Sequence, residues 1–326
     1  MSAAHDALDP MLRGFVTAIC SEGARLAGGR SLDWPQRRAI AETVRTPWRA
    51  GGPTMAQITT HRIDSAAGAF DLRLYRPAGL RHPAPALVYV HGGGWCLFSL
   101  DTHDRLMREL AARAGIVVVG IDYALAPEHP YPTALRQCVD AVRALRTRAD
   151  DFGLDATRLA IGGDSAGANL ALATALQLRD LDGQTGLAGL LLHYGAFDTA
   201  IDADSAATLG AADAMLSADE MADYWRAYLG ATADRCRDPA AVPAHAALHA
   251  LPPTLLLWGE RDVLATQNAA MAARLRASGV EVDTQAYAGA PHSFLEAMSV
   301  SEIARDALAR GADWLRTRLA SAGADA

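Results

Sequence analysis

A strand, a Gly-x-Ser-x-Gly pentapeptide and a helix follow one another near the middle of the chain. The pentapeptide places Ser165 between Gly163 and Gly167, after the apolar run 159–162 and before the Ala- and Leu-rich stretch 169–178. Glycine on both sides permits a sharp strand-to-helix turn, because a side chain there would collide with neighbouring backbone. The turn exposes the serine beside a helix N-terminus, where developing negative charge is favoured. In a chain with 28 glycines the pentapeptide alone is a weak pattern, and its context makes it specific.

A glycine-rich loop lies upstream of this serine. The loop is His91-Gly92-Gly93-Gly94-Trp95, and it follows the apolar run 86–90, which predicts a buried parallel strand. Three glycines leave backbone N–H groups uncovered at the end of that strand. An oxyanion hole needs such donors. The alternative is an ordinary flexible turn, and the later serine pentapeptide argues against it.

These motifs resemble those of the hormone-sensitive-lipase-like family of α/β-hydrolases, also called bacterial esterase family IV. The resemblance rests on HGGGW at 91–95, DYALAPEHPYP at 122–132, GDSAGAN at 163–169, an Asp after a late strand and a His near the C-terminus. The motifs occur in the family's order and cover about residues 58–320. The resemblance implies a serine carboxylesterase that acts on short- to medium-chain acyl esters without a cofactor. It also implies that the backbone N–H groups of Gly93, Gly94 and Ala166 form the oxyanion hole.

Four positions depart from the family pattern. Ala168 stands where a second Gly usually follows the Ser-Ala-Gly, and Val263 stands where Pro usually follows the acid. Ser293 replaces the Gly that usually follows the histidine, and Ala124 replaces an Arg. None of the four is a reacting group. They therefore bear on substrate preference and loop packing and leave the reaction class unchanged.

The other members of a catalytic triad are expected in the order Ser, acid, His, which α/β-hydrolases share. Asp262 directly follows the apolar run 254–258, and His292 comes after it, in a loop behind the predicted strand 282–287. Active-site groups of open α/β sheets gather outside the C-terminal ends of the strands, and all three candidates follow strands. Glu260 is the rival acid, and the family's position favours Asp262.

Composition limits the function classes. The chain has 326 residues and is 51% hydrophobic, which is enough for one large core and a small cap. A net charge of −7 disfavours nucleic acid and anionic membrane surfaces. The apolar runs fall far short of the ~18 residues of a membrane span, and no secretory signal opens the sequence. The four cysteines form no C-x-x-C pair. We therefore expect a cytoplasmic protein that acts on a small-molecule ester, and the sequence leaves open whether it forms a homodimer.

No metal site is expected. His245 and His249 have the spacing of helical metal ligands, but the Glu of an H-E-x-x-H motif is missing. An EF-hand loop starting at Asp202 would need Gly where Ala207 stands. The sequence also has no dinucleotide-binding fingerprint and no P-loop.

Apolar runs that predict strands alternate with segments that predict helices. This order predicts an α/β-hydrolase fold, which is a mostly parallel eight-stranded sheet with helices on both faces and a helical cap. The first two strands are expected to be antiparallel. Strands are expected at about 56–64, 69–76, 86–90, 116–121, 158–162, 188–193, 254–258 and 282–287, and helices near 102–113, 133–149, 166–180, 264–278 and 301–318.

Two segments fall outside this alternation. They are the N-terminal helical segment 1–55 and an insertion at about 198–240 within the catalytic domain 56–326, and by analogy with the family we expect them to form the cap. Several large apolar side chains in these segments either form a wall for the acyl chain or pack the cap onto the body. They are Phe15, Trp34, Met215, Leu216 and Trp225.

Two other functions use the same fold. One is a catalytically inactive, ligand-binding member, as the family's plant hormone receptors illustrate, and the other is an acyltransferase. Retention of Ser165, Asp262 and His292 favours an enzyme over a receptor. The sequence does not decide whether water or an alcohol is the second nucleophile.

Overall fold

The computed structural model describes residues 7–211 and 214–321, and within them the strands form one eight-stranded sheet. The strand order is β1-β2-β4-β3-β5-β6-β7-β8. β1 and β4 both pair antiparallel with β2, and every other pairing is parallel. The strands are β1 (Gln57–Ile63), β2 (Phe70–Arg76), β3 (Ala84–Val90), β4 (Val117–Asp122), β5 (Leu154–Asp164), β6 (Gly189–His193), β7 (Thr254–Gly259) and β8 (Val282–Tyr287). The predicted fold class is confirmed.

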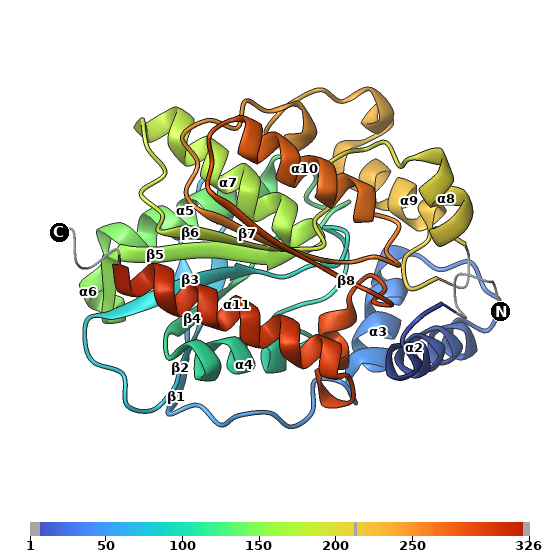
Figure 1. Ribbon diagram of the computed structural model, residues 1–326, viewed down its shortest axis with the longest axis horizontal. Coiled ribbons are helices and arrows are strands. Elements are labelled where there is room, and N and C mark those ends of the chain that lie inside the picture. The colour runs from blue at the N-terminus through green and yellow to red at the C-terminus, as the bar shows by residue number, and fades with distance from the viewer. Residues whose placement is uncertain (1–6, 212–213, 322–326) are drawn as a thin grey trace.

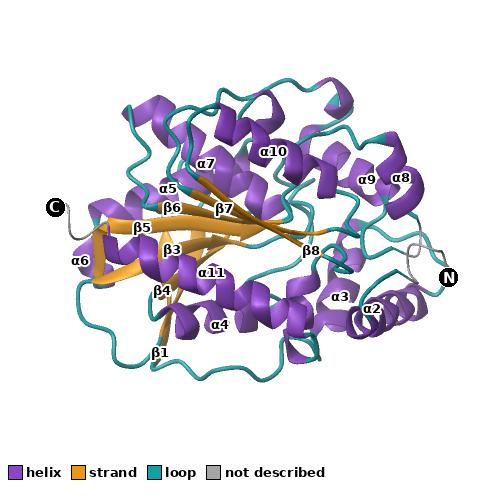
Figure 2. Cartoon of the chain, viewed as in Figure 1, coloured by secondary structure: helices purple, strands orange, loops and turns teal. Residues whose placement is uncertain are grey.

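Helices cover both faces of this sheet, as Figures 1 and 2 show. On one face α4 (Asp104–Ala114) and α11 (Glu302–Ser321) share a core with Leu87 and Tyr89 of β3. On the other face α5 (Thr133–Thr147), α7 (Ala166–Asp182) and α10 (Ala265–Ala277) share the second core, which includes Val88 of the same strand. β3 is therefore covered on both sides, which explains why its sequence is an unbroken apolar run rather than an alternating one.

β5 begins earlier than the sequence predicted, at Leu154 instead of about residue 158. The short helix α6 (Ala149–Phe152) ends at Gly153, whose left-handed conformation turns the chain directly into the strand. The pairing with β3 then shifts register between Ala84 and Ala86. The first part of β5 carries polar residues, so its sequence lacks the apolar signal that marked the rest of the strand.

Four helices outside the sheet layers gather at one end of the molecule (Figure 1). They are α2 (Pro10–Ala27), α3 (Trp34–Arg45), α8 (Ala203–Leu209) and α9 (Ala218–Leu229). Strong end signals delimit them: Asp9 caps α2, and Asp33 with Gln36 forms a capping box on α3. Residues 1–6, 212–213 and 322–326 of the expected segments lie outside the described residues. Among the helices described, none is long and apolar enough to cross a membrane.

Short 3₁₀ helices connect the remaining elements. They are η1 (Ala233–Arg235), η2 (Pro243–His245) and η3 (Phe294–Ser299). η3 follows directly on the loop that carries His292, and its Phe294 and Leu295 are fully buried beneath α11. This burial fixes the chain immediately after the histidine.

Candidate active site

Ser165 lies at the turn between β5 and α7, in a backbone conformation that L residues rarely adopt. Its φ is 54° and its ψ is −120°. The turn is held by neighbours on both sides: the Ser165 N–H donates to the carbonyl of His193 at 2.9 Å, and the Ser165 carbonyl accepts from the N–H of Asn169 at 3.2 Å. The side chain is thereby raised above the ends of the parallel strands.

The two glycines of the pentapeptide make this turn possible. A Cβ atom at Gly163 would lie 2.4 Å from the carbonyl oxygen of Val90, and a Cβ atom at Gly167 would lie 2.0 Å from the same oxygen. No side chain fits at these distances. The steric reason inferred from the sequence therefore applies here, and the obstacle is the end of β3.

Three side chains far apart in the sequence form one hydrogen-bonded chain. His292 Nε2 lies 2.9 Å from Ser165 Oγ, and His292 Nδ1 lies 2.7 Å from Asp262 Oδ2. Asp262 is 1% exposed, and Ser165 and His292 are each 6% exposed. The other oxygen of Asp262 accepts from the N–H of Leu264 at 2.9 Å. The rival acid Glu260 points to solvent, so the structure places Asp262 at the histidine.

Backbone contacts join the loop of the acid to the loop of the histidine. The N–H groups of Glu260 and Arg261 donate to the carbonyls of Tyr287 and Ala290 at 3.0 and 2.9 Å. A Cβ atom at Gly259 would lie 2.1 Å from the Ala290 oxygen. The end of β7 and the loop after β8 therefore lie in direct contact, which fixes the separation of Asp262 from His292.

The glycine-rich loop begins where β3 ends and turns sharply. Gly93, Gly94 and Trp95 have φ values of 109°, 58° and 61°. In the part of the chain that the structure describes, the N–H groups of Gly93, Gly94 and Ala166 donate to no protein acceptor. Ala166 is the first residue of α7, where N–H groups lack partners within the helix. Three donors are thus free to bind a ligand oxygen.

A buried carboxylate, which the sequence analysis did not single out, links the serine turn to the glycine-rich loop. Asp164 Oδ1 accepts from the Tyr89 hydroxyl at 2.8 Å and from the N–H of Gly92 at 3.1 Å, and His103 Nε2 lies 3.3 Å from Oδ2. All these groups are buried. An acid at the variable position of the pentapeptide is the only hint of this network in the sequence.

Electrostatics make Asp164 and His103 a charged pair. Burial by itself would raise the pKa of the Asp164 carboxyl, but the charge and hydrogen bond of His103 lower it to about 2. Burial would lower the pKa of His103, but the Asp164 carboxylate raises it above its usual value. Burial lowers the pKa of His91 to about 3 and that of His193 to about 4, so both imidazoles are neutral.

A cavity of about 410 Å³ lies among α2, α3, α9 and the end of the glycine-rich loop. Tyr224 from α9 lines it and also covers Gly94, where a Cβ atom would lie 2.4 Å from the ring. The cavity therefore adjoins the candidate oxyanion donors. Apolar and charged groups both line it: Ile19, Leu32, Ile40, Ala41, Val44, Leu97, Phe98 and Met215 with Arg37, Arg45, Glu220 and Asp223.

The apolar residues proposed for an acyl wall divide into two groups. Met215 lines the cavity. Phe15 lies in the core that contains Leu87 of β3, and Trp225 packs against Trp95 at 4.3 Å, so both belong to the packing between the helices and the body. Leu216 is also in the buried core, and the partly buried Trp34 packs against that core.

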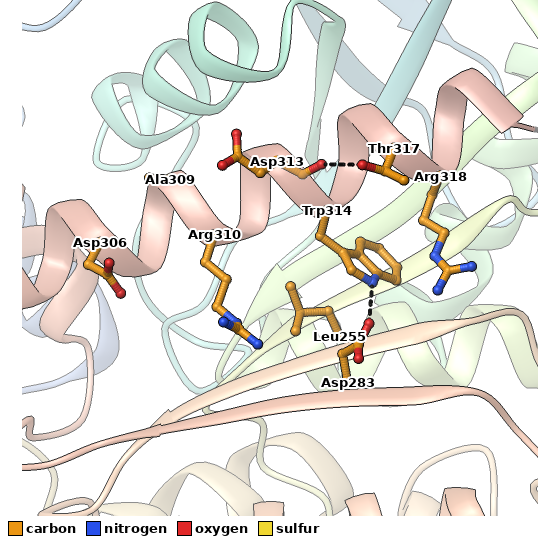
Figure 3. Close-up of a pocket in the computed structure, with 9 residues that line it drawn as sticks. All are labelled: Leu255, Asp283, Asp306, Ala309, Arg310, Asp313, Trp314, Thr317 and Arg318. Carbon is orange, nitrogen blue, oxygen red and sulfur yellow. Dashed lines mark hydrogen bonds between the residues drawn. The ribbon is translucent and has the colours of Figure 1, made fainter.

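A second surface pocket lies away from these residues. It has a volume of about 520 Å³ and lies between α11 and the strands β7 and β8 (Figure 3). Trp314 Nε1 donates to Asp283 at 3.1 Å across this pocket. Ser165, Asp262 and His292 line neither this pocket nor the cavity of about 410 Å³, but only that cavity includes Tyr224, which covers Gly94 of the glycine-rich loop.

Within residues 7–211 and 214–321, no group of three or more His, Cys, Asp or Glu side chains is arranged to hold a metal ion. His245 lies in η2 and His249 in the turn that follows. The spacing that resembled helical ligands therefore does not fall within one α-helix.

A serine at a strand-to-helix turn of a mostly parallel, doubly covered sheet is typical of the α/β-hydrolase class. A family model described as the alpha/beta hydrolase fold matches residues 87–296. The chain belongs to this family, in the hormone-sensitive-lipase-like branch that its motifs resemble.

Solved structures of esterases are similar over almost the whole chain. A hyperthermophilic esterase from the archaeon Pyrobaculum calidifontis is 32% identical, with 95% of this chain and 98% of that chain covered and a TM-score of 0.88. An α/β-hydrolase from the metagenome of Lake Arreo, Spain, is 30% identical, with coverages of 97% and 99% and a TM-score of 0.88. A thermostable carboxylesterase from a metagenomic library is 30% identical, with coverages of 88% and 98% and a TM-score of 0.83.

Proposed function

We propose that this protein is a serine carboxylesterase that hydrolyses short- to medium-chain acyl esters through an acyl-serine intermediate. The observation that carries the proposal is the hydrogen-bonded chain from Ser165 through His292 to Asp262, beside three N–H groups without a protein acceptor. The similar structures include a carboxylesterase and other esterases, which supports the same chemistry here. A complete chain of this kind also argues against an inactive receptor.

Each side chain of the proposed triad has one role. His292 Nε2, which lies 2.9 Å from Ser165 Oγ, takes the proton of the hydroxyl as the oxygen attacks the ester carbonyl, because an imidazole can both accept and return a proton. Asp262 holds the imidazole in the tautomer that presents Nε2 to the serine and stabilises the imidazolium. The proton then passes to the leaving alcohol. Water, deprotonated by His292, releases the acid and regenerates the serine.

The proposed oxyanion hole consists of the N–H groups of Gly93, Gly94 and Ala166. The ester carbonyl oxygen gains a negative charge when its carbon becomes tetrahedral, and preorganised donors stabilise that charge most in a site with little water. Ala166 contributes in addition the positive end of α7, a long helix whose first N–H groups are unpaired.

We propose that segments 1–55 and 198–240 form a cap over the catalytic domain 56–326 and that the acyl chain enters the cavity beneath it. The clustering of α2, α3, α8 and α9 at one end supports this assignment. The cavity's partly apolar lining and its limited volume of about 410 Å³ favour short- to medium-chain acyl groups. We also propose a cytoplasmic location, since none of the four cysteines, all within the described residues, forms a disulfide.

Steady-state hydrolysis of a series of p-nitrophenyl esters, from acetate to palmitate, tests this function. We expect wild-type activity with the shorter esters and a loss of at least about 10³-fold in kcat for Ser165→Ala, because the triad acts as a unit. Adding a primary alcohol distinguishes acyl transfer, which would yield the new ester in preference to the free acid. Absence of hydrolysis by a folded wild-type protein would refute the proposal.

A further inference from the structure

The turn that carries two of the proposed oxyanion donors is strained. Gly93, Gly94 and Trp95 all have positive φ, and Trp95 has a side chain at a φ of 61°. For such a residue the left-handed conformation costs roughly 1–2 kcal/mol. Inside the turn, the N–H groups of Cys96 and Leu97 both donate to the carbonyl of Gly93, at 3.0 and 2.8 Å. A strained turn of this kind persists where its surroundings hold it.

Aromatic packing holds the turn from one side. The Trp95 ring stacks on Tyr228 with a centroid distance of 4.6 Å and an interplanar angle of 3°, and it also contacts Trp225. Tyr224 covers Gly94. These contacts are made by α9. They restrict the position of the Trp95 side chain, but they make no hydrogen bond to the carbonyl groups of the turn.

The carbonyl groups of the turn are held from the other side, where a single guanidinium from α3 binds three partner residues. Arg38 Nε donates to the carbonyl of Cys96 at 2.7 Å, and Arg38 Nη2 donates to the carbonyl of Ala126 at 2.8 Å. Arg38 Nη1 donates to Glu128 at 2.9 Å. Ala126 is itself bonded to the turn, since its N–H donates to the carbonyl of Trp95 at 2.9 Å. The guanidinium therefore joins α3, the turn and the loop that contains Glu128.

The chemistry of this contact suits Arg and no other residue. The guanidinium presents several donors in a rigid planar fork, whereas a Lys ammonium is a compact point charge on a flexible stem. The Arg38 side chain is only 23% exposed, so water replaces its hydrogen bonds incompletely when it is removed. The Cys96 carbonyl belongs to the same peptide as the Leu97 N–H, which donates to the carbonyl of Gly93. A shift of that peptide is therefore passed on to the peptide between Gly93 and Gly94.

We propose that Arg38 is a positioning residue for the oxyanion hole and that it couples α3 of the N-terminal segment to the reaction rate. The inference rests on the proposed esterase function, because it assigns the oxyanion donors to this turn. Donors stabilise the transition state only when they lie within hydrogen-bond distance of the oxyanion. A displacement of the turn therefore lowers kcat and leaves the binding of the uncharged ester nearly unchanged.

Variants of Arg38 separate this role from a merely structural one. We expect Arg38→Gln to lower kcat for p-nitrophenyl butyrate by about tenfold or more, the scale of lost charge-assisted hydrogen bonds, with KM within about twofold of wild type. Arg38→Lys keeps the charge but not the fork, and we expect a similar loss. The matched control is Arg30→Gln, because the Arg30 guanidinium also binds two backbone carbonyls, but those of its own helix end. Its kcat is expected to equal that of wild type.

Two readouts decide the outcome. A wild-type kcat in Arg38→Gln, or a rise in KM with kcat unchanged, overturns the proposal. Hydrogen exchange provides a measurement independent of activity: the amides of Cys96 and Leu97 are expected to exchange faster in Arg38→Gln than in wild type, while those of β3 are unchanged. Unchanged exchange at both amides also overturns it. If wild type hydrolyses no ester, the proposed function fails, and hydrogen exchange still tests the coupling between Arg38 and the turn.

Discussion

The strained conformation of Ser165 exposes its hydroxyl to any electrophile that reaches the ends of the strands. An organophosphonate carries a tetrahedral phosphorus that mimics the attacked ester carbon, so it should add irreversibly to the Oγ that His292 contacts at 2.9 Å. We expect one adduct per chain, located by peptide mass spectrometry on the peptide that contains Ser165, and none in Ser165→Ala. An adduct at another residue would contradict the assignment of the nucleophile.

Substitution of Gly93 tests whether its N–H group is an oxyanion donor. A Cβ atom there would lie 2.3 Å from the carbonyl oxygen of Leu97, at a φ of 109°, so Gly93→Val must displace the turn. We expect kcat to fall by around 10²-fold or more, the typical effect of a lost oxyanion donor. Gly79→Val is the control, since Gly79 also has positive φ but nothing within 4 Å of its added Cβ atom. An equal kcat in Gly93→Val and Gly79→Val would argue against the proposed donors.

The buried pair of Asp164 and His103 makes stability depend on pH. The Asp164 carboxylate raises the pKa of His103 in the folded state. The contribution of His103 to the free energy of unfolding is therefore fully present below its pKa in the unfolded chain, about 6.5. That contribution is lost as the pH rises through the pKa of His103 in the folded protein. The pKa of Asp164 is lowered to about 2, so its contribution is present above the unfolded value of about 3.9 and is lost as the pH falls toward 2.

Replacing His103 should remove the alkaline part of this dependence. We expect His103→Gln to lower the free energy of unfolding at pH 6 by about 3 kcal/mol, because it leaves a buried carboxylate without its partner. The difference from wild type should shrink between pH 7 and the folded pKa of His103, as urea denaturation across this range would measure. His61→Gln is the control, since His61 contacts Thr59 on β1 and not the buried pair. A constant difference at every pH would contradict the charged pair.

The sequence indicated which residues of the proposed triad lie together better than it indicated the residues that contact their loops. Ser165, Asp262 and His292 each follow a strand in the order that the fold family dictates, so chain order alone brings them together. His103 and Arg38 carry no such signal, because their contacts with Asp164 and Cys96 bridge 61 and 58 residues of sequence. Which carbonyl or carboxylate they meet depends on how helices and loops pack, and no local pattern records it.

At the scale of elements, strand and helix positions followed from local signals. Apolar runs bounded by Gly and Pro located the strands, and the capping residues of α3 and α9 are those expected at helix starts. The prediction missed the beginning of β5, where tertiary pairing with β3 overrides a polar sequence. The prediction also left open whether the apolar residues of the helical segments face the substrate or the core. Hydrophobic periodicity shows which face of a helix is buried but does not show what that face contacts.

The proposed acyl cavity gives a test at this scale. Met215 lies in the connection before α9 and lines the cavity, so Met215→Trp should fill part of it. We expect the preferred acyl chain to shorten by about two carbons, because each methylene that can no longer be buried forfeits about 0.8 kcal/mol. Leu181→Trp on the exposed face of α7 serves as the control. An unchanged chain-length profile in Met215→Trp would place the acyl chain outside this cavity.

At the scale of the whole molecule, the alternation of apolar runs with helical segments was enough to predict the sheet, its antiparallel first strands and the helices on both faces. Right-handed crossover connections leave few ways to arrange such units. The relation of α2 and α3 to α9 could not be predicted, because these segments are far apart in the sequence and meet through tertiary contacts such as Trp34 with Tyr224 and Arg37 with Asp223. That arrangement lines the proposed acyl cavity.

The limited volume of the proposed acyl cavity, about 410 Å³, predicts how kcat/KM depends on the length of the acyl chain. Each methylene buried in an apolar pocket contributes up to about 0.8 kcal/mol, so kcat/KM should rise with chain length until the cavity is full. We expect an optimum between roughly C4 and C8, beyond which further carbons meet the wall or remain in water. A lipase at an oil–water interface would instead accept long chains and accelerate above the solubility limit of its substrate. Rates with p-nitrophenyl esters and emulsified triolein distinguish the two. Interfacial activation, or an optimum at C14–C16, would contradict the proposed substrate class and leave the proposed triad intact.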